Sequence, residues 1–195
     1  MSDETSVQDW RQMVPPIFAA CVAEESGRYQ LDRPWTERGK VYATNGRMAV
    51  RGPVSLVTGT LPQPDGDYRF PPVDEVMEPP STFVETPTPL PAIDESTVAR
   101  QQCPKCRGQG LCNNCDCGAE HECGNCDGMG DFPADSIRTV IDENANYGLS
   151  HVLIYKLRKA GVDHVFLRKD GRRDRPCRFV WGECEGVVMP MAATN

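Results

Sequence analysis

Seven of the ten cysteines lie between residues 103 and 130, where they recur in closely spaced pairs. Two cysteines separated by two residues can place both thiolates on one tetrahedral ion, so repeated pairs of this spacing indicate zinc. The segment has few aliphatic side chains, so an apolar core could not take the place of the metal. Eight ligands predict two zinc ions. They are Cys103, Cys106, Cys112, Cys115, Cys117, His121, Cys123 and Cys126.

The outer two pairs occupy matching Cys-x2-Cys-x-Gly-x-Gly frames, so we expect them to share one ion. This first site consists of Cys103, Cys106, Cys123 and Cys126. The inner ligands then form a second site, which consists of Cys112, Cys115, Cys117 and His121. Every ligand is a protein atom, so no coordination position is left for a catalytic water and both sites are structural.

The cysteine segment resembles the cysteine-rich region of DnaJ-type co-chaperones. In that family the first repeat pairs with the last and the two middle repeats pair together. The two inner repeats of this chain depart from the pattern, because they lack the Gly-x-Gly and one of them ends in His121. The resemblance therefore supports the outer site more strongly than the inner one.

Disulfide bonds are the alternative use of these cysteines, and they require an oxidising compartment. Residues 1–10 are polar and acidic, without the charged and then apolar pattern of a secretion signal. No apolar run approaches the roughly 20 residues that span a membrane. We therefore expect a cytoplasmic protein without membrane contact, whose reduced thiolates bind metal.

The charge of the cysteine segment argues against phosphate binding by this module. Its ordinary side chains carry a balance of −2, and thiolate-rich zinc sites make the total more negative. Binding to nucleic acid is driven by Lys and Arg that neutralise phosphates. The whole chain has a formal charge of −7, so it is no general polyanion binder, although local basic stripes can exist.

Two similar halves flank the cysteine segment. In the first half, residues 15–27 predict a helix with prolines in its first turn and an apolar stripe. Residues 40–52 predict two strands around the tight turn Asn45-Gly46. Ten of the seventeen prolines follow between residues 53 and 91, which favours connecting or edge-strand structure.

In the second half, residues 136–141 predict a strand. Residues 150–161 predict a helix, with Ser150 as its N-cap and Gly161 as its stop. Residues 163–191 predict three strands separated by turns. The sequence thus predicts an α+β domain made of a duplicated helix plus antiparallel β-meander.

The predicted domain is assembled from two segments of the chain. Its first half and the proline-rich connection occupy residues 1–100, and its second half occupies residues 133–195. The zinc-binding module occupies residues 101–132 and is inserted between them.

Residues 40–50, with the sequence KVYATNGRMAV, resemble the strand–turn–strand of bacterial DNA polymerase sliding clamps. Residues 186–191, GVVMPM, resemble the strand that closes those clamps near the C-terminus. The resemblance implies a single clamp-like domain. Clamps are rings of six such domains whose helices face double-stranded DNA, so it also implies a homo-oligomer, and short peptides of replication or repair proteins as partners.

The resemblance implies a peptide pocket at these two strands. The matching residues are Arg47, Met48, Val187, Met189, Pro190 and Met191. Two departures weaken the match: the turn is one residue shorter, and Ala192 replaces the usual arginine. In bacterial clamps the two strands belong to neighbouring domains, so we expect a one-domain chain to build the pocket between subunits or not at all.

Basic residues of the second half are candidates for contacts with DNA phosphates. They are Lys156, Arg158, Lys159, Arg172 and Arg173. The alternative is that the helix residues favour a helix C-terminus through its dipole and the others are merely solvated. The first predicted helix offers Glu24 and Glu25 instead of lysine, which argues against DNA.

No phosphate loop, nucleophile elbow or metal-hydrolase motif is present, so we predict a non-catalytic protein. Cys21, Cys177 and Cys184 fall in helix or strand patterns typical of small buried side chains. His151 and His164 lack a catalytic partner at a meaningful spacing, which favours structural roles.

The resulting hypothesis is a zinc-stabilised, sliding-clamp-like accessory protein of DNA replication or repair that tethers or docks partners at DNA. One alternative is a clamp-fold interaction module that encircles no DNA. A second is a DnaJ-like module that binds polypeptide from an unrelated scaffold, although the chain has no His-Pro-Asp tripeptide of a J-domain.

Overall fold

A computed structural model describes most of the chain outside the cysteine segment. The described residues are 9–23, 31–61, 70–98, 101–102, 109, 111–112, 121–122, 131–132, 137–144 and 146–191. The α+β class predicted from the sequence is confirmed.

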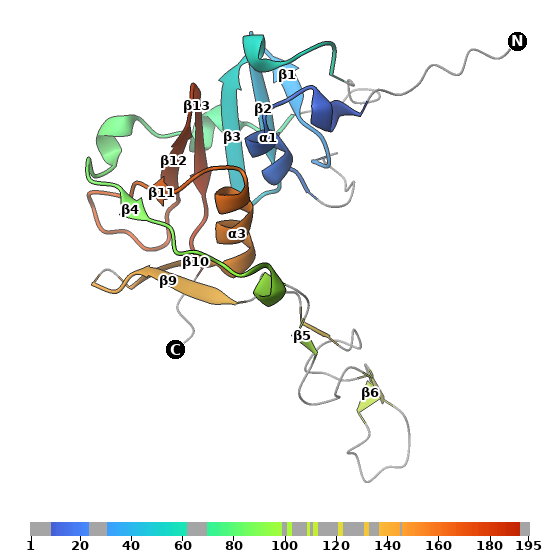
Figure 1. Ribbon diagram of the computed structural model, residues 1–195. Coiled ribbons are helices and arrows are strands. Elements are labelled where there is room, and N and C mark those ends of the chain that lie inside the picture. Colours follow the sequence, from blue (N-terminus) through green and yellow to red (C-terminus); the bar gives the residue numbers. More distant parts are fainter. Residues whose placement is uncertain are drawn as a thin grey trace, which may run out of the picture.

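A five-stranded antiparallel sheet forms the centre of the protein, in the order β1-β2-β3-β13-β12 (Figure 1). The strands are β1 (Trp35–Glu37), β2 (Lys40–Thr44), β3 (Met48–Pro53), β12 (Cys177–Trp181) and β13 (Cys184–Val188). The two halves of the chain join where β3 pairs with β13, with Met48 opposite Val188 and Arg51 opposite Glu185.

The turn between β2 and β3 forms as predicted, through local side-chain chemistry. The Asn45 side chain accepts hydrogen bonds from the backbone N–H groups of Arg47 (2.9 Å) and Met48 (2.8 Å). Gly46 adopts a φ of +82°, which glycine tolerates without strain. The Thr44 hydroxyl donates to the Met48 carbonyl (2.7 Å) and accepts from the Gly46 N–H (3.1 Å). These bonds fix the end of the hairpin.

Helix α1 (Pro16–Ala20) is shorter than the helix predicted over residues 15–27. The prediction of its end at Gly27 was wrong, because the chain turns away at Cys21. The N–H of Ala23 then bonds to the carbonyl of Leu31 (2.7 Å) instead of continuing the helix.

Helix α3 (His151–Lys159) confirms the second predicted helix. Gly161, with a φ of +90°, ends it as predicted. Ser150 occupies the N-cap position, but its side chain makes no capping bond. Its buried Oγ has no hydrogen-bond partner within the described ranges. The prediction of Ser150 as the N-cap residue is therefore confirmed for its position, whereas the expected capping hydrogen bond is not formed.

Both helices pack on one face of the sheet and form the main core with it (Figure 1). The core combines aromatic and aliphatic side chains from both halves of the chain. Fully buried members include Ile17, Phe18, Val41, Met48, Val50, Leu149, Ile154, Leu157, Val165 and Phe179.

The opposite face of the sheet carries a smaller apolar cluster under helix α2 (Val73–Val76). Trp35 lies stacked between Tyr42 and Phe70, with ring centroids 5.7 and 5.3 Å apart. The proline-rich connection is therefore more than an edge or a linker, since it covers this face and buries Val73.

The remaining elements are short. Strand β4 (Thr88–Pro89) pairs with β11 (His164–Val165), which confirms edge-strand structure in the proline-rich connection. The other paired strands are β5 (Gln101–Gln102) with β8 (Asp131–Phe132), β6 (Leu111–Cys112) with β7 (His121–Glu122), and β9 (Arg138–Asp142) with β10 (Tyr147–Ser150). The 3-10 helices are η1 (Trp10–Gln12), η2 (Val54–Leu56), η3 (Pro80–Thr82) and η4 (Glu95–Val98).

Substitution of Gly186 tests the close approach of β13 to its neighbours. A Cβ at Gly186 would lie 2.6 Å from the Ala49 carbonyl oxygen and still closer to the Phe179 ring. We expect Gly186→Ala to lower the free energy of unfolding by about 1–3 kcal/mol through overpacking, measured by urea denaturation. Gly182→Asn is the control: the site is open, and asparagine tolerates its φ of +54°. An unchanged stability of Gly186→Ala would contradict the packing.

Candidate functional site

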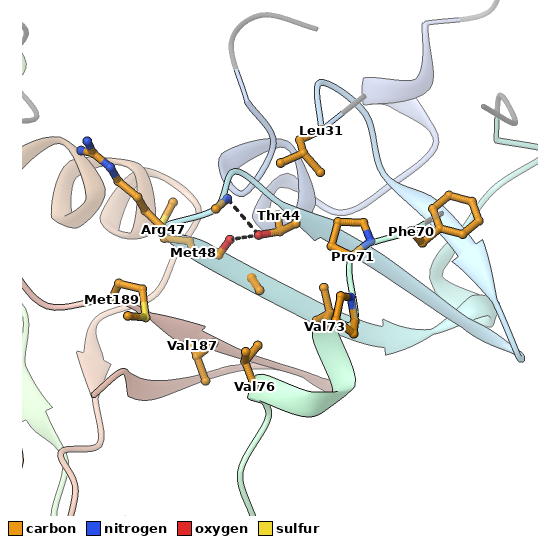
Figure 2. Close-up of a pocket in the computed structure, with 13 residues that line it drawn as sticks. Leu31, Thr44, Arg47, Met48, Phe70, Pro71, Val73, Val76, Val187 and Met189 are labelled. Carbon is orange, nitrogen blue, oxygen red and sulfur yellow. Dashed lines mark hydrogen bonds between the residues drawn. The ribbon is translucent and has the colours of Figure 1, made fainter. Parts of the chain in front are cut away.

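A pocket of about 520 Å³ opens on the α2 face of the sheet (Figure 2). Four parts of the chain line it: Leu31, the end of the β2–β3 hairpin, the end of β13, and the segment from Phe70 through α2. The lining residues are Leu31, Thr44, Gly46, Arg47, Met48, Ala49, Phe70, Pro71, Pro72, Val73, Val76, Val187 and Met189.

Four of the six residues predicted for the peptide pocket line this cavity: Arg47, Met48, Val187 and Met189. The pairing of β13 with β3 sets Val187 opposite Ala49. Beyond the strand, the Met189 N–H donates to the Arg47 carbonyl (2.8 Å), which holds the two motifs side by side.

The expectation that the two motifs meet only between subunits was wrong. In this chain both motifs are on adjacent strands of one sheet, because β3 and β13 are direct neighbours. A single chain therefore provides the residues of both motifs.

Pro190 and Met191 do not line the pocket, in contrast to the prediction. The Met191 N–H donates to the Gly148 carbonyl (2.9 Å), and Arg138 donates to the Met191 carbonyl (3.3 Å). These bonds draw the chain away from the pocket and onto β10.

The sequence prediction missed the walls that the proline-rich connection provides. Phe70, Pro71, Pro72, Val73 and Val76 all line the pocket. The three-residue spacing of the two valines behind a proline pair was an available signal for one short helical turn.

The mouth of the pocket exposes apolar side chains. Val76 is 47% exposed and Met189 is 40% exposed, and only two other large hydrophobic residues of the described part, Val54 and Val140, are comparably exposed. Exposed apolar side chains that gather around a cavity are typical of a binding surface, whereas isolated ones need no explanation.

A polar network holds α2 against the sheet. Arg51 forms an ion pair with Asp74 of α2. The same guanidinium donates to Glu185 of β13 through Nη2 (2.6 Å) and Nε (2.9 Å). The Tyr42 hydroxyl donates to Asp74 (3.0 Å), and Lys40 lies 3.8 Å from it. Asp74 therefore positions the wall that α2 contributes to the pocket.

The network changes the acidity of two of its members. The hydrogen bond from Arg51 lowers the pKa of Asp74 below its ordinary value, with a further contribution from Tyr42. Burial, together with the neighbouring Asp74 carboxylate, raises the pKa of Tyr42 to about 12.

The residues predicted to contact DNA are engaged in several ion pairs. Arg158 pairs with Asp163, Lys159 lies 3.5 Å from Glu95, and Arg172 lies 2.7 Å from Asp174. Lys156 is half-buried on α3, and Arg173 is exposed in the loop between β11 and β12. These pairings favour the alternative in which the helix residues and the loop residues serve local structure.

Six of the eight predicted zinc ligands lie outside the described residues: Cys103, Cys106, Cys115, Cys117, Cys123 and Cys126. Cys112 and His121 stand directly opposite one another across the β6–β7 pair. Across the described ranges, no cluster of three or more His, Cys, Asp and Glu residues is arranged to hold a metal.

The other cysteines and histidines have structural surroundings. Cys21, Cys177 and Cys184 are free and buried, as predicted. Burial raises the pKa of Cys177 to about 12 and that of Cys184 to about 11, which keeps both thiols protonated. The Nδ1 of His151 lies 2.9 Å from the Thr139 hydroxyl, and His164 packs edge-on against Phe166.

Comparison with protein-family models, curated proteins and solved structures found no match to this chain. Within the part of the chain that the structure describes, no helix has the length and apolar character needed to cross a membrane.

Substitution of Asp74 tests the network that holds α2. We expect Asp74→Asn to lower the free energy of unfolding by about 1 kcal/mol at neutral pH, because Arg51 and Tyr42 lose a charged acceptor. The folded-state pKa of Asp74 is lowered. The contribution of Asp74 to the free energy of unfolding is therefore fully present above about pH 4, the ordinary pKa of aspartate. It is lost as the pH falls through the lowered pKa that Asp74 has in the folded protein.

Urea unfolding of both proteins from neutral to acidic pH checks this expectation. The stability difference between wild type and Asp74→Asn must shrink toward acid. Glu75→Gln, an exposed neighbour on α2, is the matched control and should show little difference at any pH. A difference that is independent of pH would argue against the ion pair.

Proposed function

We propose that this chain is a non-catalytic, clamp-like docking domain that binds a short extended peptide of a replication or repair protein. The observation that carries the proposal is the pocket in which Arg47, Met48, Val187 and Met189 lie together. These residues come from the two motifs that resemble the peptide-binding strands of sliding clamps.

The shape and lining of the pocket support a peptide as its occupant. A volume of about 520 Å³ is within the range of small-ligand sites, and it suits a few apolar side chains rather than a folded domain. Val76 and Met189 leave apolar surface at the mouth. Peptide-binding grooves typically use such pockets for anchor side chains of an extended segment.

The polar groups of the pocket support a binding role over a catalytic one. Thr44 is committed to the hairpin turn through two hydrogen bonds. Arg47 is the single ionisable residue among the lining residues, which include no Cys, Ser, His, Asp or Glu. A nucleophile or a general acid–base pair is therefore lacking in this lining.

The zinc module belongs to the proposal as a structural element. Cys112 and His121 are paired across β6 and β7, a spacing compatible with two ligands of one ion. Strand β5 immediately precedes Cys103, and its partner β8 follows the last cysteine pair, so the ends of the module are brought together. Both pairings support the assignment of outer and inner ligands to separate ions.

Contact with double-stranded DNA and assembly into a ring remain part of the hypothesis, with weaker support. The common packing of α1 and α3 on one sheet face suits a helix-lined hole. The carboxylate partners of Arg158, Lys159 and Arg172 reduce their capacity to bind phosphates. A docking domain that encircles no DNA is therefore the second form of the proposal.

Peptide selection tests the docking function. We expect a random decapeptide library panned on the immobilised chain to yield sequences with apolar anchor residues. Met189→Glu should weaken the selected peptides at least about tenfold, or about 1.4 kcal/mol, because a charge enters the apolar mouth. Fluorescence anisotropy of labelled peptides measures the affinity.

Val140→Glu is the matched control, because Val140 is 42% exposed and lies on β9 outside the pocket. This variant should bind the selected peptides as the wild type does. Failure to select any peptide, or equal binding by the Met189→Glu variant, would refute docking at this pocket.

Native mass spectrometry of protein purified without chelator tests the zinc sites and the assembly state together. We expect two zinc ions for each chain, and loss of the metal should unfold the module because structural zinc supplies about 10–16 kcal/mol of folding free energy. Six subunits would support encirclement of DNA, whereas a monomer or dimer would restrict the chain to docking. Absence of zinc would contradict the module as proposed.

A further inference from the structure

A second pocket, of about 580 Å³, opens at the opposite end of the sheet strands from the peptide pocket. It lies where the β1–β2 turn, the end of β3 and the β12–β13 turn meet. Four cationic side chains and two carboxylates line it: Arg38, Lys40, Arg51, Arg178, Glu183 and Glu185. The net charge of the side chains that line this pocket is therefore +2.

Arg51 is the one cation of this pocket with its hydrogen bonds made. It donates to Glu185 at 2.6 and 2.9 Å and pairs with Asp74, so its charge is largely compensated by these two carboxylates. It serves the α2 network described above.

With the described residues, the other three cations make only long ion pairs. Arg178 lies 3.7 Å from Glu185, Lys40 lies 3.8 Å from Asp74, and Arg38 lies 3.8 Å from Glu37. These distances exceed a hydrogen bond, so each side chain keeps donors that the described residues do not satisfy.

Arg178 is the most informative of the three. Its side chain is only 20% exposed and lies over the Phe166 ring, 5.8 Å from the centroid. Its Nε is buried and has no hydrogen-bond partner among the described residues. Its Nη2 lies 3.7 Å from the nearest Glu185 oxygen, beyond a hydrogen bond, so an oxyanion in the pocket would supply an acceptor for this accessible edge of the guanidinium.

Arg38 brings a further cation to the mouth at a conformational cost. It has a φ of +50° in the two-residue turn between β1 and β2 and is 84% exposed. A two-residue hairpin turn favours asparagine or glycine at such a position, and arginine there is strained. The sequence thus keeps a positive charge at a place where a neutral residue would fold better.

We propose that this pocket binds the phosphate group of a small phosphate monoester, held by Arg38, Lys40 and Arg178. A phosphate monoester carries about −1.5 to −2 charges at neutral pH and three strong acceptor oxygens, which suits three cationic donors around one pocket. A carboxylate offers only two oxygens. The volume leaves room for an organic group beside the phosphate. This site is separate from the peptide pocket and does not depend on the proposed docking function.

The test is a titration of the full chain followed by ³¹P NMR at constant ionic strength. Inorganic phosphate is the first probe, and adenosine monophosphate is the second, which adds an organic group. We expect saturable changes in the ³¹P signals with both probes. Stronger binding of the monophosphate would identify an ester as the preferred ligand, and equal binding would limit recognition to the phosphate itself.

Two variants locate the effect. Arg178→Gln should weaken binding at least about tenfold. Arg38→Asn should weaken binding while raising the unfolding temperature, because asparagine suits the turn. Arg11→Gln, which removes an exposed arginine outside the pocket, should change neither property. Absence of saturation with both probes would overturn the proposal. So would variants Arg178→Gln and Arg38→Asn that bind both probes as tightly as the wild type does.

Discussion

The pairing of β3 with β13 is the constraint on which the rest of the structure depends. It joins two halves of the chain that are more than a hundred residues apart and makes them one sheet. At one end of the ladder it brings Met189 to Arg47, and at the other it brings Glu185 to Arg51. Both pockets therefore exist only while these two strands are neighbours, and Gly186 permits their close approach.

One face of the sheet carries the main core, and the other carries the pocket that we propose binds a peptide. The face under α1 and α3 is filled by the main core. Among the described residues, the other face is covered mainly by the segment around α2, which is held by Asp74 and buries Val73. Incomplete cover leaves the apolar pocket on one side of this segment. The ion-pair network of Asp74 holds this segment against the sheet. Loss of that network would therefore also disturb the wall that the segment contributes to the pocket.

The sequence predicted those elements whose causes are local. The turn at Asn45-Gly46 rests on its own side-chain bonds, and α3 follows from its apolar spacing and Gly161. The motifs at residues 40–50 and 186–191 also predicted four of the residues that line the pocket. Helix α2 was not predicted, because four residues give only a short local signal and its support comes from Arg51, which is 23 positions away. The end of α1 was missed for the same reason, since the Ala23–Leu31 bond is not encoded in the helical pattern.

The central proposal is that one chain alone forms a peptide-docking pocket between the two motifs that resemble those of sliding clamps. The most direct test is methyl NMR of protein labelled at its methionine methyl groups, with a library-selected peptide added. The account predicts that the signal of Met189, at the mouth of the pocket, shifts on binding, while that of Met13, in the main core, stays unchanged. Binding that leaves Met189 unshifted would contradict it.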